Sequence, residues 1–127
     1  MSQWSVDDLS RIGNSEEVHI SSLSRDGALR KPVTTWIVRQ GDDLYVRSVR
    51  GRHGHWFRGV QERHEGRIRA GGVQRDVSFV EADNDLSNDI DAAYRTKYRR
   101  YVGSILDSVL TSDARSATLK LVPSSAS

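Results

Sequence analysis

One segment of the chain concentrates the residue types that could bind a ligand or a metal. Residues 51–72 read GRHGHWFRGVQERHEGRIRAGG and contain three histidines, five arginines, six glycines and a Trp-Phe pair. Such a mixture is compatible with a metal site, a nucleic-acid surface, a phosphate-binding loop or a solvent-exposed helix. The spacing of the individual residues has to separate these possibilities.

The histidines do not form a recognisable metal-binding pattern. His53 and His55 alternate along the chain, so their side chains would diverge in a strand, and His64 is distant from both. The sequence completes no evident ligand set around them. The chain has no cysteine, which excludes disulfides, cysteine-ligated zinc and thiol catalysis. We therefore predict that the protein holds no metal.

Several common catalytic and nucleotide-binding signatures are also missing. The sequence has no Gly-x-Ser-x-Gly motif, and its spacing reveals no other hydrolase triad. The glycines at positions 51 and 54 form neither a dinucleotide fingerprint nor a P-loop. These absences argue against a serine hydrolase and a P-loop enzyme.

The residues around position 50 suit an anionic ligand. A predicted strand ends here and a short helix begins near Gly54. The exposed N–H groups of a helix N-terminus and the fork of an arginine side chain both bind phosphate well. The residues that we expect to take part are Arg47, Ser48, Arg50, Gly51 and His53, with Trp36 or Trp56 beside a planar ring.

The charge distribution leaves a nucleic-acid partner open. The net charge is only +2, but residues 47–75 hold eight arginines, with aromatic residues interleaved. Cations beside aromatic rings can hold single strands, although no RNA-binding signature is present. A solvated basic face is the simpler interpretation, and any nucleic-acid binding is expected to be weak and non-specific.

Local patterns predict which elements position these residues. Ser5 can cap a helix that ends near Gly13, and Asp26-Gly27 and Gly71-Gly72 are typical of hairpin turns. Tyr45, Arg47 and Val49 would share one face of a strand, opposite Leu44, Val46 and Ser48. The ranges predicted as strands are 17–25, 33–40, 44–49, 67–70, 73–81 and 117–122. Helices are expected over residues 55–63 and, with amphipathic spacing, over 86–101.

This order predicts a mainly β protein with helices, an α+β chain. Six short strands joined mostly by hairpins protect their edges best when the sheet closes. We therefore expect a six-stranded antiparallel split β-barrel with capping helices, and a helix-capped open sheet is the alternative. One domain over residues 1–123 and a frayed tail over 124–127 fit the length. No signal peptide or membrane span is evident, so a cytoplasmic protein is expected.

The central part of the chain resembles a known family. The stretch RKPVTTWIVRQGDDLYVRSVRGRHGHWFRGVQERHEGRIRAGG is similar to bacterial split-β-barrel proteins, namely deazaflavin-dependent nitroreductases and pyridoxamine-phosphate-oxidase-like flavoproteins. Residues 41–46 resemble the family's Asp-Gly-Asp-x-Tyr-Val turn, and His53 and Trp56 keep its His-to-Trp spacing. The family's Asn-Leu is replaced by Gly59-Val60, and its Asn-Pro is missing. The segment IDAAYRTKYRRY is similar to an uncharacterised bacterial branch of this group.

The resemblance implies a flavin- or deazaflavin-dependent oxidoreductase that acts on a small organic molecule, with FMN or a deazaflavin as cofactor. It further implies a homodimer with its sites at the interface, where we expect Val33, Ile37 and Val38. The alternatives are a cofactor-free barrel that binds or converts a small molecule by acid–base chemistry, or a weak nucleic-acid binder. The residues expected to hold phosphate or carboxylate are Arg30, Lys31, Arg47, Ser48, Arg50 and His53, with Trp36 and Trp56 walling the ring. The candidates for proton donation are Tyr45, Tyr94 and Tyr98.

Overall fold

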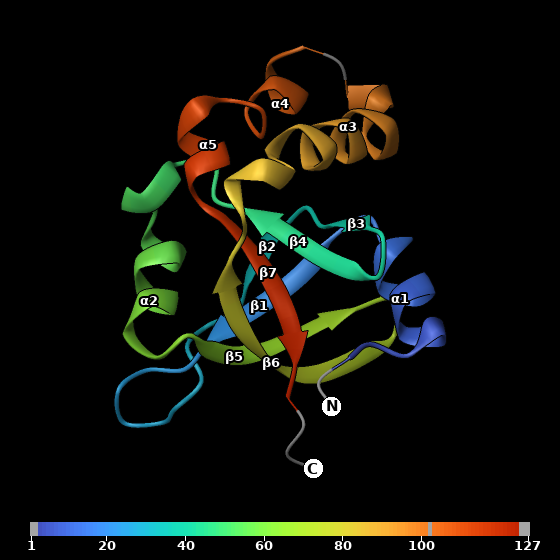
Figure 1. The fold of residues 1–127 in the computed structure, drawn as a ribbon. Coiled ribbons are helices and arrows are strands. Elements are labelled where there is room, and N and C mark those ends of the chain that lie inside the picture. The colour runs from blue at the N-terminus through green and yellow to red at the C-terminus, as the bar shows by residue number, and fades with distance from the viewer. Residues whose placement is uncertain (1–2, 102, 125–127) are drawn as a thin grey trace.

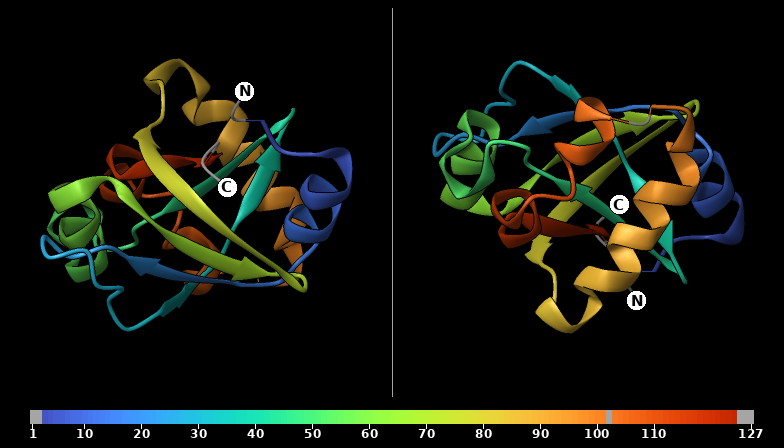
Figure 2. Two further views of the ribbon diagram at one scale, coloured as in Figure 1. Left: turned by 90° about the horizontal axis from the view of Figure 1, so that it is seen from below. Right: turned by 90° about the horizontal axis from the view of Figure 1, so that it is seen from above.

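The computed structural model describes residues 3–101 and 103–124. All strands belong to one antiparallel sheet of seven strands, in the order β2-β1-β5-β6-β7-β4-β3. The sheet curls on itself, as Figures 1 and 2 show. The strands are β1 Val18–Ser22, β2 Val33–Thr35, β3 Val38–Gln40, β4 Asp43–Arg47, β5 Glu65–Ala70, β6 Val73–Glu81 and β7 Thr118–Pro123.

The helices gather around this curled sheet. Helix α1 (Val6–Gly13) and helix α2 (His55–Arg63) lie on opposite sides of it. The helices of the last third lie together at one end (Figure 1), and their bounds are α3 Ser87–Lys97, α4 Ser104–Asp107 and α5 Ser112–Ser116. Three 3-10 turns connect these elements: η1 Gly51–His53, η2 Asn84–Leu86 and η3 Arg99–Tyr101. Among the described residues, no helix is long and apolar enough to cross a bilayer.

The predicted antiparallel sheet is confirmed, but the prediction of six strands is wrong. The strand expected over residues 33–40 is broken at Trp36-Ile37, and its halves become β2 and β3. These halves pair with β1 and β4, which places them at opposite ends of the strand order. Only two residues separate β2 from β3, and each residue spans at most about 3.6 Å. The two ends of the sheet must therefore approach each other.

A distant tyrosine explains why the strand breaks. The Tyr98 hydroxyl accepts a hydrogen bond from the Ile37 N–H at 3.1 Å and lies 3.0 Å from the Ile37 carbonyl oxygen. The Trp36 ring stacks on Tyr98 with the ring centroids 3.9 Å apart. Lys97 Nζ also donates to the Ile37 carbonyl, so the side chains of Tyr98 and Lys97 satisfy backbone groups that a neighbouring strand would otherwise satisfy.

The local turn and cap predictions are confirmed. The Asp8 N–H donates to the Ser5 hydroxyl at the start of α1. The turn glycines Gly27, Gly71 and Gly72 all have positive φ, which suits tight hairpins. The second hairpin starts earlier than predicted, because His64 ends α2 in the left-handed conformation and β5 begins at Glu65. At the predicted tail, Ser124 donates to Asp76, and residues 125–127 lie outside the described residues.

Two apolar clusters pack against the sheet. The inner cluster fills the curled sheet and includes Leu44, Val46 and Phe57. The outer cluster joins β3 and β4 to the C-terminal helices and includes Tyr45, Tyr94 and Tyr98. The predicted alternation of β4 is confirmed, since Leu44 and Val46 face one cluster and Tyr45 the other.

Candidate functional site: two adjoining pockets at the start of helix α2

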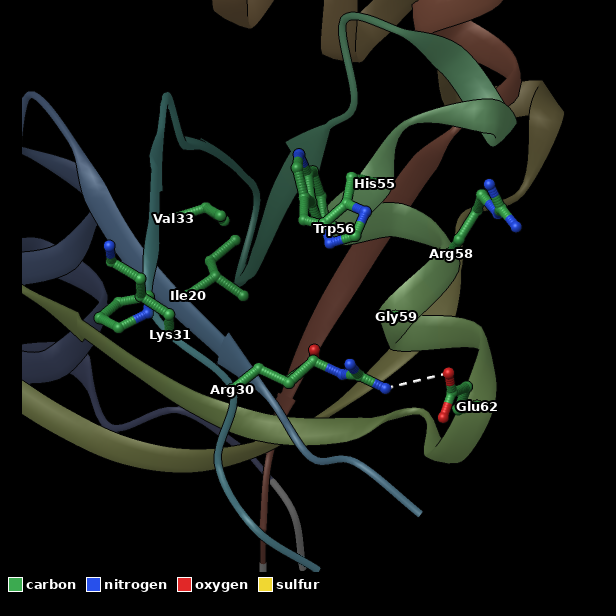
Figure 3. Close-up of a pocket in the computed structure, with 11 residues that line it drawn as sticks. Ile20, Arg30, Lys31, Val33, His55, Trp56, Arg58, Gly59 and Glu62 are labelled. Atoms are coloured by element: carbon green, nitrogen blue, oxygen red, sulfur yellow. Dashed lines mark ion pairs between the residues drawn. The ribbon is translucent and has the colours of Figure 1, made fainter.

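A pocket of about 710 Å³ opens between the β1–β2 connection and helix α2. Figure 3 shows Arg30 reaching from the connection toward Glu62 on the helix, with Trp56 and His55 at the helix start. The lining residues are Ile20, Ser22, Arg30, Lys31, Pro32, Val33, His55, Trp56, Arg58, Gly59 and Glu62. Both apolar and cationic side chains therefore face this space.

A second pocket of about 290 Å³ adjoins the first. The two share Val33, His55 and Trp56. The remaining residues of the smaller pocket are Thr34, Thr35, Ser48, Val49, Arg50 and Gly54. One ligand could therefore extend from the larger pocket past Trp56 toward the end of β4.

The first turn of α2 offers unpaired donors to the smaller pocket. Gly54 is the N-cap of this nine-residue helix and supplies no side-chain cap. The first N–H groups of a helix have no acceptor within the helix, and they carry the positive end of its dipole. The start of α2 is therefore suited to an anion.

A buried hydroxyl lies beside this helix start. Ser48 is 0% exposed, and its Oγ has no hydrogen-bond partner among the described residues. A Cβ added to Gly54 would lie only 2.4 Å from that oxygen, so the two residues are in close contact. The Ser48 backbone is already used, because its N–H donates to Ala117 and its carbonyl accepts from Gly51. The hydroxyl is thus the one polar group of Ser48 that has no partner among the described residues.

The cations of the site differ in how far they are neutralised. Arg30 Nη2 lies 2.9 Å from a Glu62 carboxylate oxygen, and Arg25 Nε lies 3.6 Å from the other. Over the described ranges, Lys31, Arg50 and Arg58 have no carboxylate within 4.0 Å. Taken together, the two pockets are lined by these three cations and by a single carboxylate, that of Glu62. An anionic ligand would therefore be attracted.

The absence of a side chain at Gly59 leaves room for Arg30 to lie against α2. A Cβ at this position would come 3.3 Å from Arg30 Nε and 3.2 Å from the Ser22 hydroxyl. The Nε of Arg30 is buried there and has no partner within residues 3–101 and 103–124. The arginine thus lies pressed against α2, with its guanidinium directed to Glu62.

Five of the residues predicted for cofactor binding line the two pockets, and four do not. Those in the pockets are Arg30, Lys31, Ser48, Arg50 and Trp56. Gly51 and His53 belong to the turn η1, which precedes α2. Gly51 is buried with a φ of 71°, and a Cβ there would lie 3.1 Å from Asp113 Cβ. It packs η1 onto α5 rather than lining either pocket.

The structure does not place Arg47 in the site. Its side chain is 0% exposed and forms an ion pair with Asp91. Its other donors bond the Thr118 hydroxyl at 2.9 Å and the Val109 carbonyl at 2.9 Å. The guanidinium also lies 5.4 Å from the centre of the Tyr94 ring. This arginine therefore joins β4 to the C-terminal helices.

The predicted aromatic residues are also divided between the pockets and the outer cluster. Trp56 lines both pockets, whereas Trp36 packs on Tyr98 against the outer cluster. Tyr45, Tyr94 and Tyr98 are buried in that cluster and line neither pocket. Burial raises the pKa of each of these phenols above its ordinary value, so they remain protonated at neutral pH. The geometry gives them no role as proton donors in the site.

Sequence reasoning missed the pocket-facing side of α2. His55, Gly59 and Glu62 line the larger pocket at helical spacing. The i, i+4, i+7 pattern marks one face of a helix. That pattern was the signal that could have identified them.

Throughout the part of the chain that the structure describes, no group of three His, Asp or Glu side chains could hold a metal.

Known structures share this fold at low sequence identity. A candidate pyridoxamine 5'-phosphate oxidase from Listeria innocua has a TM-score of 0.62 and 14% identity, with 91% of this chain and 89% of that chain covered. A FAD-binding protein from Mesorhizobium loti has a TM-score of 0.60 and 12% identity, with coverages of 96% and 91%. An F420 reductase has a TM-score of 0.54 and 16% identity, with coverages of 92% and 93%. At these identities the likeness establishes the split-barrel fold alone.

A family assignment rests on sequence. No curated protein matches the chain. A bacterial family described as "Uncharacterized protein conserved in bacteria (DUF2255)" matches residues 8–121, which include every strand of the sheet except the last residues of β7. The chain therefore belongs to the DUF2255 family.

Proposed function

We propose that the two adjoining pockets bind a planar, phosphate-bearing cofactor, a flavin such as FMN or a deazaflavin, and that the protein is an oxidoreductase acting on a small organic molecule. One observation carries the proposal. The N-terminus of α2, the Ser48 hydroxyl and Arg50 meet in one pocket that continues past Trp56 into a larger one, and within the described ranges neither the hydroxyl nor Arg50 has a partner.

The residues present fit such a group. The Ser48 hydroxyl, Arg50 and the first-turn N–H groups of α2 would hold a phosphate through charge-assisted hydrogen bonds. Trp56 offers an aromatic surface to a flat ring, and Arg30 and Lys31 lie beyond it. Both pocket volumes are within or close to the range typical of cofactor sites.

The cofactor would supply the electron transfer, and the protein would supply binding and orientation. Residues His55 and Glu62 line the larger pocket and are the titratable groups best placed to face a substrate. Two of the similar structures support the proposal through their descriptions, one as a FAD-binding protein and the other as an F420 reductase.

We also propose that the protein acts as a homodimer whose partner subunit covers the site. Val49 supports this, because it lines the smaller pocket and is 48% exposed. The contacts expected from sequence need correction. Ile37 and Val38 are buried within the protomer at 0% and 1% exposure, so they are unavailable to a partner. Val33 remains, since it is half-buried and lines both pockets.

A cofactor-free enzyme is the second candidate. A histidine and a carboxylate line one pocket, which is the minimum for acid–base chemistry on a small molecule.

Nucleic-acid binding has less support. Of the eight arginines in residues 47–75, five form ion pairs: Arg47, Arg52, Arg63, Arg67 and Arg75. This pairing neutralises much of the basic surface.

The test is a titration of the protein with FMN, riboflavin and coenzyme F420, followed by absorbance and fluorescence. FMN is expected to bind more tightly than riboflavin, which lacks the phosphate. Arg50→Ala should weaken FMN binding about ten- to a hundredfold, because one charge-assisted bond contributes roughly 1.5–3 kcal/mol. Riboflavin binding should change little in the same variant.

Arg67→Ala is the matched control, because Arg67 pairs with Asp76 away from both pockets. Its affinity for FMN should equal that of the wild type. Failure of FMN and F420 to bind the wild type below millimolar concentration would reject the cofactor proposal and leave the cofactor-free enzyme in its place.

A further inference from the structure

A groove of about 500 Å³ lies away from the two pockets, between the end of α1, strand β3 and helix α3. Its walls include the apolar side chains of Val38, Ala92 and Ala93 and the charged residues Arg39 and Lys97. In Figure 1, α1 and α3 lie on the other side of the molecule from α2. This groove shares no lining residue with the candidate site.

The amine of Lys97 is held in a fixed position in this groove. Its Nζ donates to the Ile37 carbonyl oxygen at 2.6 Å and lies 5.1 Å from the centre of the Tyr98 ring. Lys97 is half-buried and lines the groove. The bond comes from the last turn of α3 to the corner between β2 and β3, and both of these elements are anchored by Tyr98.

Burial increases the neutral fraction of this amine. Burial lowers the pKa of Lys97 to about 8, and the carboxylate of Glu16 opposes that shift only in part. The other charged groups along the groove are Arg39 and Asp89, of opposite sign. Arg39 is itself 3.7 Å from Asp42. No carboxylate lies within 4.0 Å of Nζ among residues 3–101 and 103–124.

We propose that Lys97 is a nucleophilic amine that forms an imine with a small aldehyde or ketone entering this groove. The nitrogen lone pair attacks the carbonyl carbon, and the C=O oxygen takes up both amine hydrogens and leaves as water. The product is a C=N bond, and no oxidant or reductant is needed. When protonated, the imine keeps one N–H that can still donate to the Ile37 carbonyl.

The other two lysines provide an internal comparison. Lys31 and Lys120 are the only others in the chain, and neither lines the groove. At pH 7.5, an amine with a pKa of about 8 is roughly one-quarter neutral, whereas an ordinary lysine is neutral in roughly one molecule per thousand. Part of this advantage is lost because a weaker base is a weaker nucleophile. We therefore expect Lys97 to react about tenfold faster than the other two.

The experiment treats the whole protein with propionaldehyde and cyanoborohydride, which traps the imine as a stable amine. Peptide mapping by mass spectrometry then gives the rate at each lysine between pH 6.5 and 9. Lys97 should be modified about tenfold faster than Lys31 and Lys120 at pH 7.5. In urea-unfolded protein the three rates should become equal.

Two variants test the contribution of the groove. Lys97→Arg keeps a cation on α3 and should leave the rates at Lys31 and Lys120 unchanged. Ala92→Trp narrows the groove at an exposed position, and it should slow the modification of Lys97 by benzaldehyde at least threefold. Equal rates at all three lysines in the folded wild type, or a slower rate at Lys97, would overturn the proposal whatever the variants show.

Discussion

Arg47 illustrates how one buried charge can be mistaken for a ligand-binding group. It stands next to Ser48 in the sequence, but Arg47 lies on the face of β4 that carries Tyr45, and Ser48 follows the end of the strand. Arg47 bonds residues of β7 and the helical region, and its carboxylate partner Asp91 is 6% exposed. A charge buried this deeply is tolerated only because its donors are satisfied.

We predict that Asp91→Ala destabilises the protein strongly. The substitution leaves Arg47 buried without its counter-ion, which costs about 3–5 kcal/mol in comparable cases. Urea unfolding followed by tryptophan fluorescence measures the change in the free energy of unfolding. Arg67→Ala removes an exposed ion pair and should cost less than about 1 kcal/mol. Equal losses in the two variants would contradict a structural role for the Arg47–Asp91 pair.

Lys97 should make stability depend on pH in a defined window. Burial lowers its pKa to about 8 in the folded protein, against about 10.4 in an unfolded chain. Between these values the unfolded state binds more protons, so the free energy of unfolding contributed by Lys97 rises with pH. The free energy of unfolding of the wild type minus that of Lys97→Met should therefore increase from pH 8 to 10.

Two buried tyrosines set the upper end of the pH range in which stability rises. Burial raises the pKa of Tyr94 and Tyr98 well above the ordinary value of 10.0. Above pH 10 the unfolded state loses phenolic protons that the folded state retains, so stability should fall again in both proteins. A difference between wild type and Lys97→Met that stays flat from pH 8 to 10 would show that the lysine is not desolvated.

At the scale of elements, the close contact between β4 and the start of α2 defines the smaller pocket. Ser48 and Gly54 are joined by the turn η1, which α5 covers at Gly51. The backbone of Gly54 has φ −60° and ψ 142°, which any residue can adopt. Glycine is favoured here because of space, since a Cβ would lie only 2.4 Å from Ser48 Oγ.

We predict that Gly54→Ala destabilises the protein by about 1–3 kcal/mol, the usual cost of overpacking a buried site. Ser48→Ala alone should change stability little, because the hydroxyl has no partner to lose among the described residues. The double variant should regain most of the loss, because the new methyl group no longer meets the Ser48 Oγ, its closest neighbour. A double-mutant cycle from urea unfolding measures this coupling, and simple additivity would refute the steric explanation.

Local signals made the hairpins and caps predictable, whereas the broken strand was not. Asp26-Gly27 and Gly71-Gly72 encode their turns within two residues, and Ser5 finds its partner three residues away. The break at Trp36-Ile37 depends on Tyr98, 61 residues distant from Ile37 in sequence. No local pattern could reveal that contact.

The candidate site was predictable where the sequence carried a structural constraint. Arg30, Lys31, Ser48, Arg50 and Trp56 were expected and line the pockets. Arg47 could have been set aside from the sequence, because the alternation of β4 already placed it with Tyr45 and opposite Ser48. Which cationic residues are neutralised by carboxylates depends on tertiary structure, and spacing alone does not show it.

At the scale of the whole molecule, the smaller pocket has an exposed rim at Val49, where the proposed partner subunit would make contact. We predict that light scattering at micromolar concentration gives about twice the 14.3 kDa protomer mass. Val49→Arg should shift the distribution toward monomer and leave the fold unchanged, because this side chain already faces solvent. A concentration-independent monomer mass for the wild type would refute the dimer.

The corner between β2 and β3 also has a consequence for how the sheet can open. In an ordinary open sheet, the two outer strands fray independently, and each exposes a row of unpaired N–H and C=O groups. Here Trp36 and Ile37 connect the two outer strands directly, and Tyr98 clamps the connection. Movement of one outer strand pulls on the other, so the margins of the sheet open together or not at all.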